Sequence, residues 1–406
     1  MASSATRKRD LRSGKPVWRR FRTPPVHGEA LLRDIRCDVA VIGAGISGAM
    51  IAEMLSDHGF AVAILDRRGP LKGSTAASTA LLQHEIDEPL SVLEKRIGQE
   101  DAARAWRRSK LALESLAARI RMLDIRCHMA RRPSLYLAGD RLGPHGLRDE
   151  MQARRRIGLE SQFLKHEGLR ERFGITRPAA LLSFDNIAAD PRQLTAGFLK
   201  AALSRGARLF APSEVTNVES HRDEVTVATR EGPIVRARTA IFATGYEMPK
   251  LVECRGHSII STWAIATRRQ ASRLWPEQAL IWEASDPYLY VRSTHDGRVI
   301  CGGEDEEFSD EAARDALLKK KTDAISRKLG RLLPDIDPTP LDRWTGSFGA
   351  SETGLPSIGS VPGHRNVYAV LGYGGNGITY SRIAAELLLS EMMEKVDPEK
   401  DLFAFR

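Results

Sequence analysis

The six residues Gly43-Ala44-Gly45-Ile46-Ser47-Gly48 have the G-x-G-x-x-G spacing with which a backbone approaches the phosphates of a dinucleotide. They follow a buried-strand pattern at residues 37–42 and open an amphipathic helical pattern. In such a turn Gly43 permits the sharp bend, Gly45 lets the backbone approach the pyrophosphate, and Gly48 lets the helix pack against the strand. The helix N-terminus adds free N–H groups and the positive end of its dipole. The predicted ligand contacts in this turn are Gly43, Gly45, Ile46, Ser47 and Gly48.

An acidic residue follows at the position where a dinucleotide site needs one. A second strand pattern, residues 60–65, ends at Asp66, which comes 18 residues after Gly48. Its carboxylate would accept hydrogen bonds from ribose hydroxyl groups. A carboxylate at this position, instead of a free arginine, disfavours NADP as the ligand. Both NAD and FAD remain compatible with these residues.

The next segment, KGSTAASTA at residues 72–80, consists mostly of small and hydroxyl-bearing residues. Such residues let the backbone approach a bulky planar ligand, and their hydroxyl groups can donate hydrogen bonds to phosphate. The alternative interpretation is an ordinary polar loop. The ligand contacts predicted in this segment are Ser74, Thr75, Ala77, Ser78 and Thr79.

A second glycine-rich turn, Gly372–Gly377, lies between a strand pattern at 367–371 and a helix that begins near Ile378. The N-terminus of that helix would stabilise the negative charge that a reduced flavin carries at its N1–C2=O edge. Glycines are expected here because a side chain would collide with a flavin ring. The alternative is a turn that serves packing only. The predicted contacts are Gly374, Gly375, Asn376, Gly377 and Ile378.

Two phenols and a guanidinium share one face of a predicted strand. Tyr288, Tyr290 and Arg292 alternate along the chain, and alternate residues of a strand point to the same side. Together they would form a carboxylate-binding wall above a flavin. The alternative is an outer sheet face with ordinary cross-strand pairs.

In their order along the chain, these motifs resemble the D-amino-acid-oxidase-like flavoproteins, which include glycine oxidase, sarcosine oxidase and D-amino acid dehydrogenase. The resemblance covers residues 36–406 and rests on VIGAGISGA at 41–49, Asp66-Arg67-Arg68, GSTAAST at 73–79, DPRQLTAGFLKAA at 190–202, IFATGY at 241–246, TGLPSIG at 353–359 and YAVLGYGGNGITYS at 368–381. It implies FAD in an extended pose, with Arg67 and Arg68 among its contacts. It also implies Val215 beside the adenine, and Thr244 and Gly245 along the pyrophosphate.

Three positions bear on how far that resemblance extends. Phe348 stands where glycine and D-amino acid oxidases have an arginine that anchors the substrate carboxylate, so either Arg292 replaces it or the substrate is not an amino acid. Ile300 aligns with a lysine that promotes the reaction of sarcosine oxidases with oxygen, which favours a dehydrogenase. Cys301 is the nearest residue for covalent flavin attachment, but its surroundings have a buried-strand pattern, so we expect non-covalent FAD.

These residues predict an FAD-dependent oxidoreductase that oxidises the C–N bond of a small amine or amino acid. Hydride would pass to flavin N5 and the resulting imine would hydrolyse, with oxygen or another compound as the final electron acceptor. The residues expected in the substrate pocket are Tyr288, Tyr290, Arg292 and Phe348. No side-chain base is required, because a neutral amine can deliver hydride directly.

Three alternatives stay open at this point. A flavin dehydrogenase for a hydroxy acid or polyol phosphate would be favoured by inertness toward amines. A nicotinamide-dependent dehydrogenase would be favoured by a colourless purified protein. A non-catalytic binding protein, for example one that binds nucleic acid through residues 1–22, would be favoured by salt-sensitive binding that is lost when this segment is deleted.

The elements that must position these residues predict an α/β fold. Helices are expected at 97–122, 190–204 and 310–333, with antiparallel sheet across 258–303. We predict a Rossmann-like FAD-binding domain of the glutathione-reductase type, interleaved with a substrate domain that contains a mostly antiparallel sheet and helices. The predicted boundaries are a basic irregular leader at 1–35, the FAD-binding domain at 36–92, 188–250 and 343–406, and the substrate domain at 93–187 and 251–342.

Composition limits the classes of protein to which this chain can belong. The 406 residues are 42% hydrophobic and 28% charged, which excludes overall disorder, and no apolar run is long enough to span a membrane. Residues 1–22 contribute +7 of the net charge of +9, so we expect a mobile basic tail on a nearly neutral body and no nucleic-acid partner. The cysteines, Cys37, Cys127, Cys254 and Cys301, form no paired motif, which predicts no metal site and a cytoplasmic protein.

Overall fold

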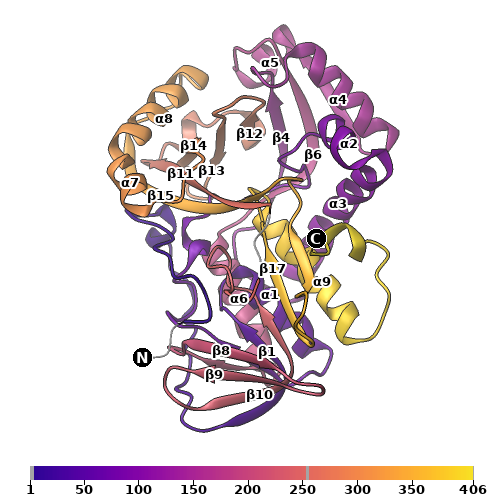
Figure 1. The fold of residues 1–406 in the computed structure, drawn as a ribbon. Coiled ribbons are helices and arrows are strands. Elements are labelled where there is room, and N and C mark those ends of the chain that lie inside the picture. Colours follow the sequence, from indigo (N-terminus) through magenta and orange to yellow (C-terminus); the bar gives the residue numbers. More distant parts are fainter. Residues whose placement is uncertain (1–3, 253–255, 406) are drawn as a thin grey trace.

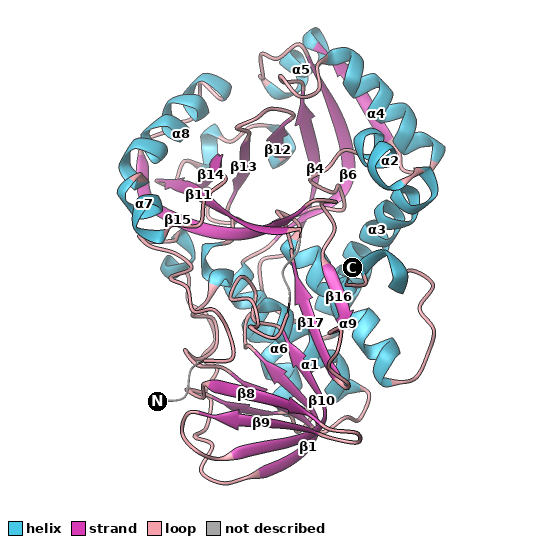
Figure 2. Ribbon diagram, in the orientation of Figure 1, coloured by secondary structure: helices cyan, strands magenta, loops and turns pink. Residues whose placement is uncertain are grey.

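Two β-sheets form the framework of the protein, and the chain crosses between them several times (Figure 1). The structure is a computed structural model that describes residues 4–252 and 256–405. In the described residues one sheet has eight strands and the other has nine (Figure 2). The α/β fold with mixed sheets is therefore as predicted.

The eight-stranded sheet has the order β16-β17-β10-β1-β2-β7, and β9 joins β10 and in turn pairs with β8. Its strands are β1 (Ile35–Ile42), β2 (Val62–Leu65), β7 (Arg208–Phe210), β8 (Val215–Ser220), β9 (Val225–Thr229), β10 (Ile234–Phe242), β16 (Ser357–Ser360) and β17 (Val367–Leu371). The pairs β1–β2, β2–β7, β1–β10 and β10–β17 are parallel. Their carboxyl ends therefore meet at one edge, where such sheets bind ligands.

Helices cover the faces of this sheet and of its neighbour. The helix that follows β1 packs against two later helices, α6 and α9. The helices are α1 (Ile46–Asp57), α2 (Leu90–Ile97), α3 (Gln99–Met122), α4 (Pro144–Arg156), α5 (His166–Phe173), α6 (Pro191–Ser204), α7 (Glu311–Ala316), α8 (Leu318–Leu332) and α9 (Gly377–Met392). Asp190 caps α6 by accepting hydrogen bonds from the backbone N–H groups of Arg192 and Gln193, as the Asp-Pro start predicted.

The nine-stranded sheet has the order β15-β11-β14-β13-β12-β4-β6-β3, and β5 pairs with β6. Its strands are β3 (Leu81–Leu82), β4 (Ala130–Leu137), β5 (Ser161–Lys165), β6 (Ala179–Ala188), β11 (His257–Thr267), β12 (Leu280–Glu283), β13 (Leu289–Ser293), β14 (Val299–Glu306) and β15 (Pro340–Ser351). Helix α8 packs on β11, β14 and β15. The antiparallel pairing of β11, β13 and β14 agrees with the pattern at residues 258–303.

One strand lies across a predicted domain boundary. The boundary at residue 343 assigns the following residues to the nucleotide domain. Strand β15, however, pairs with β11 from Pro340 to Ser351, in the nine-stranded sheet. By hydrogen bonding, this strand therefore belongs with the substrate sheet.

The N-terminal segment is packed against the body of the protein, so the expected mobile tail is wrong. We call residues 4–22 the N-terminal strap; it is indigo in Figure 1 and runs along one side of the molecule between the two sheets. Val17 and Trp18 are fully buried in the largest hydrophobic core. The backbone N–H of Ala5 donates to Val215 O (3.0 Å) and that of Lys15 donates to Arg343 O (2.8 Å), which ties the strap to both sheets.

Within the described ranges, no helix has both the length and the hydropathy that crossing a lipid bilayer requires.

Candidate active site

Three neighbouring cavities lie at the carboxyl edge of the parallel strands and below the nine-stranded sheet. The dinucleotide cavity, about 90 Å³, is lined by Gly43, Ala44, Gly45 and Ile46 of the first glycine-rich turn, together with Asp66 and Val215. The predicted contacts Ser47 and Gly48 do not line it, and the Ser47 hydroxyl is hydrogen-bonded to that of Ser381 (2.8 Å). The inner cavity, about 160 Å³, shares Ser74, Thr75 and Gly245 with it. The outer cavity, about 360 Å³, shares part of its wall with the inner cavity. The three form one path from the Rossmann-like turn to the substrate sheet.

The glycine turn forms a cradle at the start of α1. Gly43 has φ +116°, and a Cβ atom there would lie 2.4 Å from the carbonyl oxygen of Ala243. A Cβ atom on Gly48 would lie 1.9 Å from Gly43 O, so helix and strand touch at this point. At Gly45 the nearest atom to such a Cβ is Thr75 Oγ1, at 3.4 Å, and the same oxygen accepts a hydrogen bond from the backbone N–H of Ile46, the first residue of α1 (3.1 Å). The backbone there is open to the cavity, as a pyrophosphate requires.

Asp66 lies in the wall of the dinucleotide cavity, and it is already partly hydrogen-bonded. Its carboxylate accepts hydrogen bonds from the backbone N–H groups of Ala44, Arg68 and Gly69, each at 2.8 Å. Burial raises its pKa above the ordinary value, and these bonds oppose that rise. A carboxylate has about four acceptor positions, so a ribose hydroxyl remains a possible further partner.

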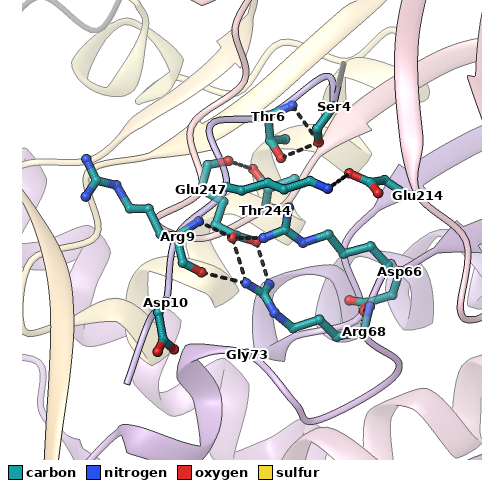
Figure 3. A network of polar contacts seen from close by, with 12 residues as sticks. Ser4, Thr6, Arg9, Asp10, Asp66, Arg68, Gly73, Glu214, Thr244 and Glu247 are labelled. Carbon is teal, nitrogen blue, oxygen red and sulfur yellow. Dashed lines mark hydrogen bonds and ion pairs between the residues drawn. The ribbon is translucent and has the colours of Figure 1, made fainter. Parts of the chain in front are cut away.

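Both predicted arginines line the same cavity and are held by a glutamate that the sequence did not single out (Figure 3). The carboxylate of Glu247 forms ion pairs with Arg67 and Arg68, the latter at 2.6 Å. Nη1 of Arg67 is buried and has no hydrogen-bond acceptor in the part of the chain that is described. A donor left without an acceptor at a cavity wall is costly, so it favours a ligand with acceptor oxygen or nitrogen atoms.

The N-terminal strap forms part of the wall of the dinucleotide cavity. Ser4, Thr6 and Leu11 line it, facing the glycine turn. Glu247 also accepts a hydrogen bond from the backbone N–H of Arg9 (2.8 Å), and Arg9 O accepts one from Nη2 of Arg68 (2.7 Å) (Figure 3). Sequence reasoning missed these contacts, although apolar residues inside a basic segment were a signal that the segment packs.

The hydroxyl-rich segment is held in place by two buried tryptophans. Nε1 of Trp18 donates to Ser78 O (2.6 Å), and Nε1 of Trp344 donates to Ala77 O (2.9 Å). One tryptophan comes from the strap and the other from β15, so distant parts of the chain fix this loop. The structure brings its predicted contacts together at the inner cavity: Ser74, Thr75, Ala77, Ser78 and Thr79.

The N-terminus of α9 faces the inner cavity without a side-chain cap. The Asn376 side chain instead donates to Gln83 O and Glu85 O, the latter at 2.7 Å. Among the described residues, no side chain accepts a hydrogen bond from the first N–H groups of α9 itself, whereas the Gly375 N–H just before the helix donates to the Asp87 carboxylate. The N-terminus of α9 can therefore stabilise negative charge in the cavity. Packing inside the protein also favours glycine at residue 375, because a Cβ atom there would lie 2.7 Å from the Asp87 carboxylate.

Tyr288 and Tyr290 form one wall of the inner cavity, with ring centroids 5.6 Å apart. Gly302 leaves space for them, since a Cβ atom there would lie 2.4 Å from the Tyr290 ring. Phe348 lines both the inner and the outer cavity.

Arg292 does not complete the predicted carboxylate-binding wall. Its guanidinium is buried and donates to Ala80 O (2.6 Å) and Ala189 O (3.0 Å). It also lies over the ring of Trp18, 5.4 Å from the centroid, and it lines none of the three cavities. The alternation of residues along the strand correctly predicted that Arg292 shares a face with the tyrosines. Its side chain, however, donates its hydrogen bonds to backbone carbonyl oxygens.

Cys301 and Ile300 are both buried in strand β14. Cys301 packs in the core between the nine-stranded sheet and α8, and burial raises the pKa of its thiol well above the ordinary value. Among the described residues the free cysteines are Cys37, Cys127 and Cys301, and none of them lines a cavity. Cys254 lies outside the described residues.

Comparison with known proteins shows the family to which this chain belongs. The family described as FAD dependent oxidoreductase (DAO) matches residues 38–391. Gamma-glutamylputrescine oxidoreductase from Escherichia coli K12 is 25% identical over 93% of this chain and 88% of its own length. Glycine oxidase from Bacillus licheniformis is 24% identical over 87% of this chain and 92% of its own length.

Solved structures show the same fold. The structure of L-proline dehydrogenase from P. horikoshii matches with a TM-score of 0.76 at 18% identity, and the match covers 92% of this chain and 97% of that one. Glycine oxidase from Geobacillus kaustophilus matches with a TM-score of 0.73 at 20% identity, over 89% of this chain and 96% of that one.

Proposed function

Because the chain belongs to the FAD-dependent oxidoreductase family, we propose that it oxidises the C–N bond of a small amine or amino acid, with FAD bound non-covalently. The observation that carries this proposal is the continuous path from the glycine cradle to the tyrosine-walled inner cavity. The names of two relatives, gamma-glutamylputrescine oxidoreductase and glycine oxidase, favour an amine or amino acid over other substrates.

The residues of the dinucleotide cavity suit the ADP half of FAD. The open cradle at Gly45 and the start of α1 would hold the pyrophosphate, beside Thr75, Thr244 and Gly245. Val215 and the unpaired donor of Arg67 would border the adenosine. The strap would cover this half of the cofactor from the outside.

The inner cavity would hold the flavin ring. When bound, FAD would accept a hydride, with its two electrons, from the carbon that bears the nitrogen. The uncapped N-terminus of α9 stabilises negative charge at the edge of the ring. Tyr288, Tyr290 and Phe348 position the substrate against the ring and exclude water from its face.

Non-covalent binding is supported by the position of the thiols. A thioether link to the flavin would need a cysteine in the inner cavity, and Cys301 instead packs in the core between the sheet and α8. The buried Ile300 offers no cation to promote reaction with oxygen, which supports an electron acceptor other than oxygen. The free cysteines of the described chain are consistent with the cytoplasmic location that we propose.

The visible absorption spectrum of the purified protein, recorded again after excess FAD and desalting, tests the cofactor. Flavin bands that acid precipitation releases into the supernatant are expected, and bands that stay with the precipitate would contradict non-covalent binding. Anaerobic addition of secondary amines and amino acids should then bleach the flavin. A folded, colourless protein that retains no FAD would overturn the proposal.

The competing substrate class consists of hydroxy acids and polyol phosphates, which are anions. A flavin that is bleached by such an anion and not by any amine would replace the proposal with C–O oxidation. The acidic wall of the outer cavity disfavours this outcome, because carboxylates repel an anionic substrate.

A further inference from the structure

The outer cavity is strongly acidic, although the chain as a whole is basic. Its wall holds seven carboxyl groups and two guanidinium groups, counted over the described residues. The net charge of the whole chain is +9, of which residues 1–22 contribute +7, so the acidity is local to this cavity. The cavity adjoins the inner cavity through Asp87, Trp282, Tyr288 and Phe348, which line both.

Only some of these carboxylates are neutralised by the protein itself. Three of them form ion pairs: Glu88 with Arg96 (2.8 Å) and Arg141 (3.3 Å), Glu283 with Arg177 (2.7 Å), and Glu306 with Lys321 (2.5 Å). The remaining four form no ion pair within the described residues: Asp87, Asp286, Asp305 and Glu307. The cavity therefore has more negative charge than the protein balances.

Asp305 differs from Asp286 and Glu307, which are exposed, in that both of its carboxylate oxygens are buried. Gly303 and Glu304 before it both have positive φ, +137° and +60°, so strand β14 bends just before this residue. Both oxygens of Asp305 are buried at the cavity wall and form no hydrogen bond of ordinary geometry, although the hydroxyl groups of Thr262 and Tyr288 lie near enough to lower the pKa of this carboxyl group. Leaving a buried carboxylate without a partner is costly, which points to a ligand that supplies one.

Other residues of the wall also favour a cation. The ring of Trp282 stacks on that of Tyr136, with centroids 3.8 Å apart, and both residues line the outer cavity. Aromatic faces attract cations. Arg96 and Arg141 are engaged by Glu88, and Phe348 adds no charge.

We propose that the substrate carries, besides the nitrogen that is oxidised, a second and positively charged group, which binds in the outer cavity against Asp305. This inference rests on the proposed C–N oxidation. It narrows the substrates to amines in which one nitrogen is attached to the carbon that is oxidised and a second nitrogen carries the positive charge. Asp286 and Glu307, which line only the outer cavity, extend the negative wall beyond the inner one. The protein thus selects its substrate by charge at the end remote from the reacting bond.

Three secondary amines with the same four-carbon chain and different terminal charge test this inference. N-methylputrescine ends in an ammonium group, N-methylbutylamine in a methyl group and N-methyl-γ-aminobutyrate in a carboxylate. We expect the FAD-loaded protein to be reduced most efficiently by the first and least by the last, in anaerobic stopped-flow measurements. The fully N-methylated putrescine dication, which cannot form an imine, measures binding alone through its perturbation of the flavin spectrum.

The variant Asp305→Asn removes the charge and keeps the shape of the side chain. We expect it to lower the preference for N-methylputrescine over N-methylbutylamine by about 30-fold, as expected for a buried charge that loses its partner. The control Glu160→Gln removes one charge from an exposed residue outside the cavity, and its preference should stay unchanged. Flavin absorbance and thermal unfolding establish that both variants are folded and loaded.

The outcomes separate this inference from the proposed function. Reduction of the flavin by the neutral or carboxylate-bearing amine in preference to N-methylputrescine overturns the inference and leaves C–N oxidation in place. Binding of the dication that Asp305→Asn weakens, without reduction by any amine, supports the cationic site and overturns the proposed oxidation. Failure of the dication to bind the wild-type protein overturns the inference directly.

Discussion

Burial raises the pKa of the carboxyl groups of Asp305 and Asp87 toward neutral pH. It raises the pKa of Asp305 to about 7, and the negative charge of Asp87 raises it further. It also raises the pKa of Asp87 to about 6, even though the Gly375 N–H stabilises the ionised form. Each carboxylate therefore gains a proton as the pH falls from neutral to mildly acidic values.

This ionisation gives the cation site a pH dependence. The ionised carboxylate attracts a cation and the protonated form does not, so affinity for the fully N-methylated putrescine dication should rise as the pH rises through about 7. Spectral titration between pH values of about 6 and 8 measures the rise, and Asp305→Asn should flatten it. The charged or titratable groups that bear on Asp305 are Asp87, Tyr288, Tyr290 and Lys321. A wild-type affinity independent of pH would contradict the assignment.

Gly45 allows a graded test of the pyrophosphate cradle. A Cβ atom at this residue meets Thr75 Oγ1 at 3.4 Å, an ordinary contact, and its φ of −79° suits any residue. Gly45→Ala should therefore fold and bind FAD more weakly, whereas Gly45→Asp should bind none, because its carboxylate would face the phosphates. Flavin content after desalting measures both. Stoichiometric FAD in folded Gly45→Asp would refute the cradle.

At the scale of elements, the glycine turns and the helices they open could be predicted from the sequence. The strand patterns at 37–42 and 60–65, the turn between them and α1 follow from local periodicity and glycine placement. The same holds for β17 and α9. These features were predictable because their signals lie within a few residues of one another.

The docking of the strap and the hydrogen-bond partners of Arg292 could not be predicted in this way. The strap is held by partners such as Glu247 and Arg343, more than 200 residues away, and its composition suggests a solvated tail. Arg292 was placed on the correct strand, but the carbonyl groups of Ala80 and Ala189 that engage it come from other elements. Local patterns contain no information about such contacts.

The strap should control how tightly FAD is held. Glu247→Gln removes the charge that pairs with Arg67 and Arg68 and weakens the contact with Arg9. We expect FAD to dissociate about ten-fold faster, corresponding to about 1.4 kcal/mol, in a fluorescence assay of released flavin. Glu311→Gln is the control, because this half-buried residue also contacts the strap, at Asp10 N and at the Arg9 guanidinium, but lies outside the cavity. Equal rates in the two variants would contradict the role of the strap.

At the scale of the whole molecule, one cofactor would touch both sheets and the strap. The dinucleotide cavity belongs to the eight-stranded sheet and the strap, and the inner cavity includes strands β13 and β15 of the other sheet. The class of fold and the interleaved domains were predictable from motif order. The elements of residues 130–188 were not, because their apolar residues show no clear period and they pair mainly with one another.

FAD that binds to both sheets and to the strap should stabilise all three together. At a free FAD concentration 100 times the Kd, binding would add about 2.7 kcal/mol to the free energy of unfolding. The Tm of the loaded protein should therefore exceed that of the FAD-free protein in a calorimetric scan, and both sheets should unfold in one transition. A single transition without FAD that does not move when FAD is added would contradict this expectation.

The order in which a ribosome makes this chain gives the strap a further consequence. Ser13 N donates to the hydroxyl of Thr345, a residue synthesised 332 positions later. Residues 13–15 of the strap can therefore dock only after β15 has been made. The residues that line the dinucleotide cavity have earlier partners, since Ala5 binds Val215 and Arg9 binds Glu247, so the strap closes over the cavity from its N-terminal end first and is fastened at β15 last.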